Sequence, residues 1–138
     1  MKKIIRLMSL LMTALVFSAV FAGCSGKLTL QEYIDQPTIR KQLDQEIETQ
    51  KKALNGAYDD IKIYVESETK LVYDFKYSPD MEIDVTYVRS LLSSESFKTE
   101  YNKVVKDIRK EMGVDNISVI ARFRNSSGAV IAEQEFNP

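Results

Sequence analysis

The side chains of this chain that could do chemistry are mainly carboxylates, because its 138 residues include no histidine and a single cysteine. Without histidine, the Ser-His-Asp and Cys-His nucleophiles, a histidine general base and histidine-ligated zinc are all excluded. The sequence also lacks a glycine-rich phosphate loop and a dinucleotide-binding fingerprint. We therefore expect no cofactor, and an enzyme built on this chain would have to work with paired acids.

One acidic run has the spacing with which a calcium loop begins. Asp80, Glu82 and Asp84 form a D-x-E-x-D pattern, but an EF-hand needs glycine at its sixth position and glutamate at its twelfth. Those positions hold Val85 and Leu91. Acids that directly precede a helix are favoured by its positive N-terminal end, which is the better explanation, and we expect no metal site.

A second acidic pair, Asp59-Asp60, falls between an expected helix and an expected strand, where solvated turn residues are common. A glycosidase would need two carboxyl groups about 5–10 Å apart across a cleft, and a short two-layer domain offers little cleft. A carboxylate-dependent enzyme acting on the cell wall stays open as an alternative function. It predicts two acids facing each other in a concave pocket, at least one of them with a raised pKa.

The beginning of the chain predicts export. Residues 1–23 combine a basic start, an apolar run and a small-residue end, as in a secretory signal peptide. The alternative is an uncleaved anchor, but the apolar run of residues 7–22 is shorter than the roughly 20 residues of a membrane span.

The segment Phe21-Ala22-Gly23-Cys24 resembles a bacterial lipobox, although leucine is more usual at the position of Phe21. The resemblance implies cleavage between Gly23 and Cys24 and lipidation of the Cys24 sulfur, so that the protein is held on the outer face of the bacterial cytoplasmic membrane. A diacylglyceryl group supplies the two chains that stable anchoring needs. It also removes a lone thiol from an oxidising compartment.

The expected organisation is a lipoprotein signal peptide (1–23), a short tether (24–28) and a single domain (29–138). Loss of the signal peptide moves the net charge from −1 to about −4. A mildly acidic chain is a poor ligand for nucleic acid, so we expect no such partner.

Apolar periodicity and turn residues predict the elements of this domain. Thr29 and Glu32 have the capping-box spacing that starts a short helix, and Pro37 suits the first turn of a second. Alternating apolar residues predict two hairpins, and a broad apolar stripe predicts a long helix between them, with a weak point at 93–96. The expected segments are helices over 29–34, 37–54 and 85–112, and hairpins over 61–77 and 116–136.

The face on which each apolar residue must lie predicts the strand registers. In the first hairpin the expected pairs are 65–71, 63–73 and 61–75, with Glu66 opposite Lys70 and Lys62 opposite Asp74. In the second they are 123–130, 121–132 and 117–136, with Val130, Ala132 and Phe136 on the covered face.

The element order α–β–β–α–β–β predicts an α+β fold: a four-stranded antiparallel sheet with the helices packed on one face. The mature chain is similar to small uncharacterised lipoprotein families of Gram-positive bacteria. The likeness rests on "LTLQEYIDQPTIRKQLDQEI", "LVYDFKY" and "SSGAVIAEQEF". It implies a lipid anchor and a fold, and no activity.

An uncovered sheet face would be a candidate binding surface. Aromatic, aliphatic and arginine side chains together are typical of interface cores. We expect a small binding module for a protein or wall component rather than an enzyme, and this hypothesis requires an exposed apolar patch of several hundred Å². The alternative is an ordinary solvated sheet face. The candidate residues are Tyr64, Val72, Ile120, Arg122, Arg124 and Ile131.

Overall fold

The structure is a computed structural model in which residues 28–53 and 55–138 are described. The predicted signal peptide, the lipobox and the cleavage site between Gly23 and Cys24 lie outside the described residues. In the part that is described, no helix is both long enough and apolar enough to cross a membrane.

Two helices begin the domain. The first, α2 (Leu30–Asp35), opens with the predicted capping box: the Thr29 hydroxyl accepts from the Glu32 amide at 3.1 Å, and the Glu32 carboxylate accepts from the Thr29 amide at 2.8 Å. The second, α3 (Pro37–Ala53), begins at Pro37, where a missing N–H costs nothing. Both predicted helix starts are therefore confirmed.

The first hairpin consists of β1 (Tyr58–Ser67) and β2 (Lys70–Tyr77). The predicted pairs of residues 65 with 71, 63 with 73 and 61 with 75 are all present, as is Lys62 opposite Asp74. The expected pairing of Glu66 with Lys70 is wrong, because a register shift between Val65 and Ser67 places Ser67 opposite Lys70. Such an irregularity adds one residue to one strand next to the turn.

The predicted long helix is two helices, α4 (Val85–Leu92) and α5 (Glu95–Met112). The break lies in the serine-rich segment, where the Ser94 hydroxyl accepts from the Phe97 amide and caps α5. The Asp84 carboxylate accepts from the Tyr87 amide at 3.1 Å and caps α4. At its start α4 thus uses one acid of the D-x-E-x-D run, as the helix-start explanation predicts.

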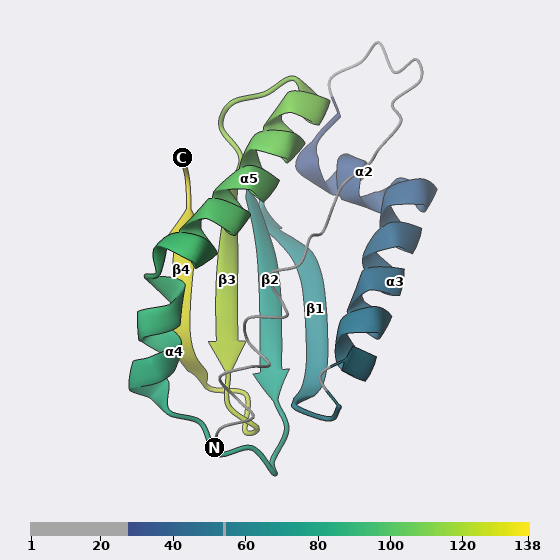
Figure 1. Ribbon diagram of the computed structural model, residues 1–138. Helices are drawn as coiled ribbons and strands as arrows, with labels where there is room; N and C mark the ends of the chain where they lie inside the picture. Colours follow the sequence, from purple (N-terminus) through teal and green to yellow (C-terminus); the bar gives the residue numbers. More distant parts are fainter. Residues whose placement is uncertain (1–27, 54) are drawn as a thin grey trace.

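The last two strands, β3 (Ser118–Arg124) and β4 (Val130–Phe136), complete a four-stranded sheet of order β1-β2-β3-β4. The α+β class is confirmed, but the all-antiparallel sheet is wrong because β2 and β3 run parallel. The reason is the crossover: α4 and α5 carry the chain back along the length of the sheet, so β3 starts at the end where β2 starts (Figure 1).

The register predicted for the second hairpin is also wrong, by two residues. Ala121 lies opposite Gln134 and Phe123 opposite Ala132, because the hairpin closes at Arg124 opposite Val130 and β4 has one extra residue between Val130 and Ala132. A shift of two residues keeps each side chain on its face, so Ala132 is buried as expected. Val130, beyond the irregularity, pairs with Arg124 and is instead 46% exposed.

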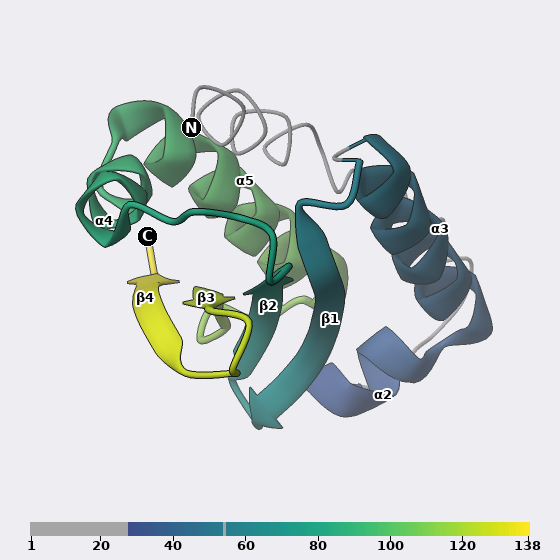
Figure 2. The same cartoon turned by 90° about the horizontal axis from the view of Figure 1, so that it is seen from below.

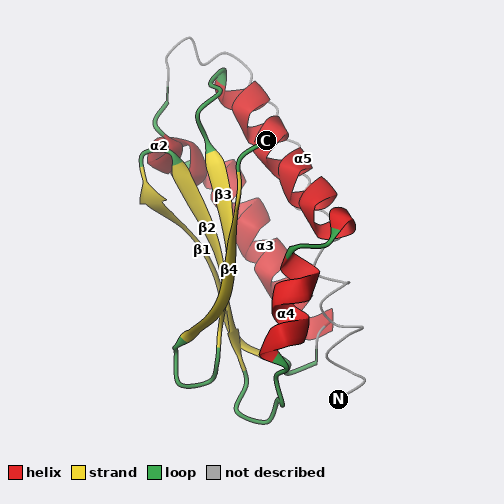
Figure 3. Cartoon of the chain, turned by 90° about the vertical axis from the view of Figure 1, so that its left-hand side faces the viewer, coloured by secondary structure: helices red, strands yellow, loops and turns green. Residues whose placement is uncertain are grey.

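All the described helices cover the same face of the sheet (Figures 2 and 3), as predicted. Between the two layers lies a core rich in stacked rings. The ring centroids of Phe75 and Phe123 are 4.9 Å apart on neighbouring strands, and those of Tyr101 and Phe136 are 4.8 Å apart between α5 and β4. The helix-covered side is thus where the fold buries its apolar surface.

Buried tyrosines make this core sensitive to alkaline pH. Burial raises the pKa of Tyr77 to about 12. Burial is also the first cause that raises the pKa of Tyr33, Tyr58, Tyr73 and Tyr101 above the ordinary value of 10.0. These groups stay protonated in the folded chain at a pH where the unfolded chain ionises them, so they oppose folding only above pH 10.

We therefore expect the free energy of unfolding to fall steeply as the pH rises above about 10, with little tyrosinate absorbance until the chain unfolds. Urea titrations at successive pH values measure this dependence. Tyr101→Phe removes one of the groups and should make the decline shallower. An unchanged slope in Tyr101→Phe would contradict the tyrosine origin of the effect.

Candidate functional site

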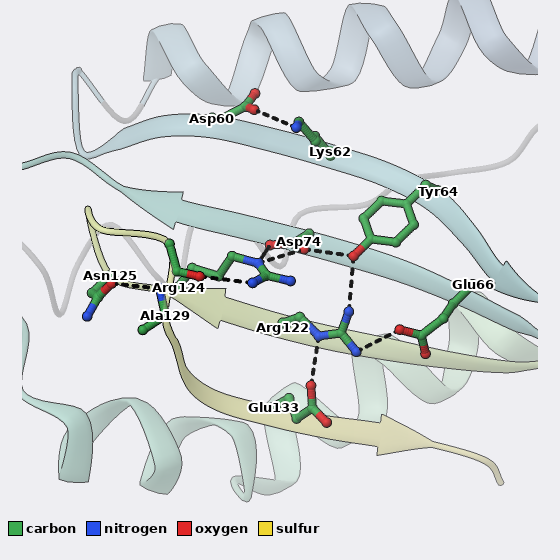
Figure 4. A network of polar contacts seen from close by, with 11 residues as sticks. Asp60, Lys62, Tyr64, Glu66, Asp74, Arg122, Arg124, Asn125, Ala129 and Glu133 are labelled. Atoms are coloured by element: carbon green, nitrogen blue, oxygen red, sulfur yellow. Dashed lines mark hydrogen bonds and ion pairs between the residues drawn. The ribbon is translucent and has the colours of Figure 1, made fainter.

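The face of the sheet that no described helix covers carries a polar network. Strand register places Lys62, Asp74, Arg122 and Glu133 in one row across all four strands. The neighbouring row begins at Tyr64, whose ring reaches across β2 toward the arginines (Figure 4). We call this surface the outer sheet face; five of the six candidate binding residues lie on it.

Arg122 is the centre of the network. Its Nε donates to Glu133 at 2.7 Å, Nη1 donates to the Tyr64 hydroxyl at 3.0 Å, and Nη2 donates to Glu66 at 3.0 Å. The side chain is only 12% exposed. Burial lowers the pKa of Arg122, but the hydrogen bonds to Glu133, Glu66 and Tyr64 outweigh it and raise that pKa above its ordinary value. Arg122 therefore joins β3 to both edge strands as a fixed cation.

Asp74 organises the other half of the network. The carboxylate, on a residue with 8% exposure, accepts from the Tyr64 hydroxyl at 2.8 Å and from Arg124 Nε at 3.0 Å on both oxygens. Arg124 Nη1 donates in turn to the Gly128 carbonyl in the β3–β4 loop at 2.9 Å. Burial, followed by the bond to Asp74, raises the pKa of Tyr64. Tyr64 thus stays neutral, as a donor to Asp74 and an acceptor from Arg122.

The predicted apolar patch is wrong for this face. Val72 and Ile120 are buried here, at 0% and 6% exposure, although no described element packs over them. Long polar side chains on neighbouring strands must therefore exclude water from them. Ile131 is half-buried and packs against the hydrophobic core instead. Among the described residues, Val130 is the only large hydrophobic that is exposed.

The other candidate acids form surface ion pairs. Asp59 pairs with Lys76 at 3.3 Å, and Asp60 lies 3.7 Å from Lys51 and 3.5 Å from Lys62. Such pairs between exposed groups contribute little stability. Within the described ranges, no group of three or more acidic or cysteine side chains could hold a metal ion.

Sequence reasoning missed a cavity on the covered side, between α3 and α5. Gln50 and Tyr73 line it and are both buried. A signal for it exists in the sequence, because glutamine at position 50 interrupts the apolar stripe of α3 at a core position. A buried polar residue in such a stripe needs a hydrogen-bond partner, so its presence indicates a polar site inside the core.

Truncation of the network at its centre should destabilise the sheet. We expect Arg122→Ala to lower the free energy of unfolding by about 1–3 kcal/mol, because Tyr64, Glu66 and Glu133 each lose a charged donor. Arg122→Lys should give a smaller loss, because the lysine ammonium keeps the positive charge although it cannot reproduce the three-way geometry of the guanidinium. Urea denaturation measures both changes.

The matched control is Arg89→Ala, an exposed arginine on α4 whose side chain forms no ion pair with a described residue. Its free energy of unfolding should stay within about 0.5 kcal/mol of the unaltered chain. Equal losses in the Arg122 and Arg89 variants would show that the network contributes no stability of its own.

Comparison with known proteins identifies a family to which the chain is similar. A family model described as a domain of unknown function (DUF4854) matches residues 30–136, which span all the described helices and strands. No curated protein and no solved structure matches the chain significantly.

Proposed function

The chain belongs to the DUF4854 family of domains of unknown function, and from that premise we propose that it is a lipid-anchored binding module on the outer face of the cytoplasmic membrane. Cys24 carries the anchor. The outer sheet face carries ordered charges in place of the apolar patch that the sequence hypothesis required, so the partner proposed for it is a polar protein or wall component. The single observation that carries the binding role is Arg122, held by three side chains from β1 and β4 on a face that no described helix covers.

The charges of this face are already ordered, which favours binding of a polar partner. Hydrogen bonds hold Arg122, Arg124 and Tyr64 in place, so little side-chain entropy remains to be lost on association. Glu66 and Glu133 stay 41% and 47% exposed at the side chain and keep acceptor capacity toward solvent. Fixed groups of both signs give specificity and orientation more than raw affinity.

The position of the domain supports an anchored role. The first helix is capped at Thr29, so only residues 25–28 separate Cys24, the proposed lipid attachment point, from the helix cap. Four extended residues reach about 14 Å. A partner would therefore be met close to the membrane surface.

The alternative, a carboxylate-dependent cell-wall enzyme, has less support on the outer sheet face. Asp74, Glu66 and Glu133 each accept from an arginine, so their charge is already engaged. An acid that must give and take a proton works best without such a fixed counter-charge.

Replacement of the cysteine tests the anchor. We expect Cys24→Ala to abolish incorporation of labelled fatty acid and to leave the precursor at its unprocessed size, because lipidation of Cys24 precedes cleavage. Gel mobility and fatty-acid labelling in the producing bacterium measure both effects. Ser25→Ala is the control and should be labelled and processed normally. Fatty-acid labelling and processing that persist in Cys24→Ala would refute lipidation at this residue.

Site-specific photocrosslinking tests the outer sheet face. Lys62 is a suitable position for the crosslinker, because its side chain is 68% exposed and lies beside Tyr64 without being part of the Arg122 contacts. We expect a discrete product in intact cells from Lys62 and none from Lys103, an exposed position on α5.

The product should also disappear in a chain that carries Arg122→Ala and is still folded, because the ordered charges are then lost. The same product from Lys103, or a product that survives Arg122→Ala, would contradict binding through this face.

A further inference from the structure

A cavity opens on the helix-covered side, at the seam between α3 and α5. Its volume is about 40 Å³, room for more than one water-sized group. Its lining residues come from β1 and β2 and from α3 and α5, so the cavity is floored by sheet and walled by helices. We call it the α3–α5 pocket; it lies on the opposite side of the sheet from the Arg122 network.

The floor and walls of the pocket are apolar. Two cross-strand pairs make the floor, Ile61 with Phe75 and Ile63 with Tyr73. Ile47 from α3 and Val104 from α5 line its walls. A surface of this kind favours an alkyl group over water.

Buried polar atoms in the pocket lack partners. The Tyr73 hydroxyl, on a side chain of 3% exposure, has no hydrogen-bond partner among the described residues. Gln50, at 9% exposure, donates from Nε2 to Glu46 at 2.7 Å, which leaves its Oε1 buried and unpaired. A buried polar atom without a partner costs about 1–3 kcal/mol, so each of these atoms calls for a partner other than the described residues.

The polar groups of the pocket are mostly acceptors, and they carry negative charge. Glu46 on α3 and Glu100 on α5 both line it, each one residue before an apolar or aromatic wall residue. Neither carboxylate forms an ion pair within the described part of the chain. With Gln50 Oε1 added, the pocket offers three acceptor groups and one hydroxyl. A complementary ligand must therefore donate hydrogen bonds and carry positive charge.

We propose that the α3–α5 pocket binds a primary ammonium group on a short alkyl stem. The stem lies on Ile61, Ile63 and Phe75. The ammonium, with its three donors, faces Glu46, Glu100 and Gln50 Oε1, and the Tyr73 hydroxyl accepts from it. The ligand is a free alkylamine or the side chain of a lysine, because both present the same chemistry.

Ligand titrations of the full chain in a nonionic detergent test this proposal. The probes are butylammonium, butanol and butyrate, which share a stem and differ in charge. Backbone amide NMR shifts of residues at the pocket report binding. We expect butylammonium to shift the amides of Gln50 and Tyr73 saturably, butanol to bind about tenfold more weakly, and butyrate to leave them unchanged.

Amide-capped lysine and its ε-acetylated form distinguish the two sources. Tighter binding of capped lysine than of butylammonium indicates a polypeptide ligand, and weaker binding indicates a free amine. The ε-acetylated form should not bind in either case, because acetylation removes the charge.

Isosteric variants test the acceptors. We expect Glu46→Gln combined with Glu100→Gln to weaken butylammonium binding about tenfold, and Tyr73→Phe to weaken it about threefold. The matched control is Glu48→Gln, on the same helix and exposed but outside the pocket, and it should change nothing.

Equal binding of butylammonium and butanol, or a double variant with unchanged affinity, would overturn the proposal in favour of a water-filled cavity. Should the double variant not fold, the comparison of butylammonium with butanol on the unaltered chain decides. Crosslinking from Lys62 tests the outer sheet face alone, so failure of the pocket proposal and failure of the proposed function can be told apart.

Discussion

The described helices cover only one face of the sheet (Figures 2 and 3), and this constraint determines which side chains each strand can carry on its two faces. On the covered face, strand residues meet helices and can be aromatic or aliphatic, as the stacked rings of Phe75 and Phe123 are. On the other face no described element provides cover, so the central residues Val72 and Ile120 must be shielded from water by their neighbours. Arginine and tyrosine do this well, because each has an apolar body and a polar end. The Arg122 network is thus a consequence of the layer arrangement as well as a candidate binding surface.

The helices, the strands and the first hairpin could be predicted because their signals are local. The capping box at Thr29 and the alternation around Val65 and Leu71 depend on residues that are close in sequence, and the structure agrees with both. The parallel pairing of β2 with β3 depends instead on where a helical crossover delivers the chain, which no local pattern records. The register of the second hairpin was wrong because the strands pair out to Arg124 and β4 carries an extra residue between Val130 and Ala132. Together these shift the pairs by two residues, and the alternation of faces does not record such a shift.

The sequence predicted which residues share the outer sheet face, but it did not predict that they form a network of charged and polar contacts. Tyr64, Arg122 and Arg124 do share a face, because alternation fixes the face of each strand residue. The order of the strands decides the contacts on this face. It brings the arginines to Asp74 and Glu133, and it surrounds Val72 with polar side chains. Once β2 and β3 are adjacent and parallel, Asp74 lies opposite Arg122 and two residue pairs from Arg124, on the same face. A surface expected to be apolar becomes an ordered set of charges.

The same arrangement explains why a pocket forms where it does. Each helical unit packs on its own part of the sheet: α3 lies on β1, whereas α5 lies on β3 and β4. The seam between them falls over β1 and β2, whose residues Ile61, Ile63 and Tyr73 need cover that neither helix fully provides. A chain selected only for stability would close such a seam with a larger apolar side chain, since cavities and unpaired polar atoms both cost free energy. Here Gln50 and the Tyr73 hydroxyl occupy the seam instead. A ligand in the seam would give these polar atoms the hydrogen-bond partners that they lack.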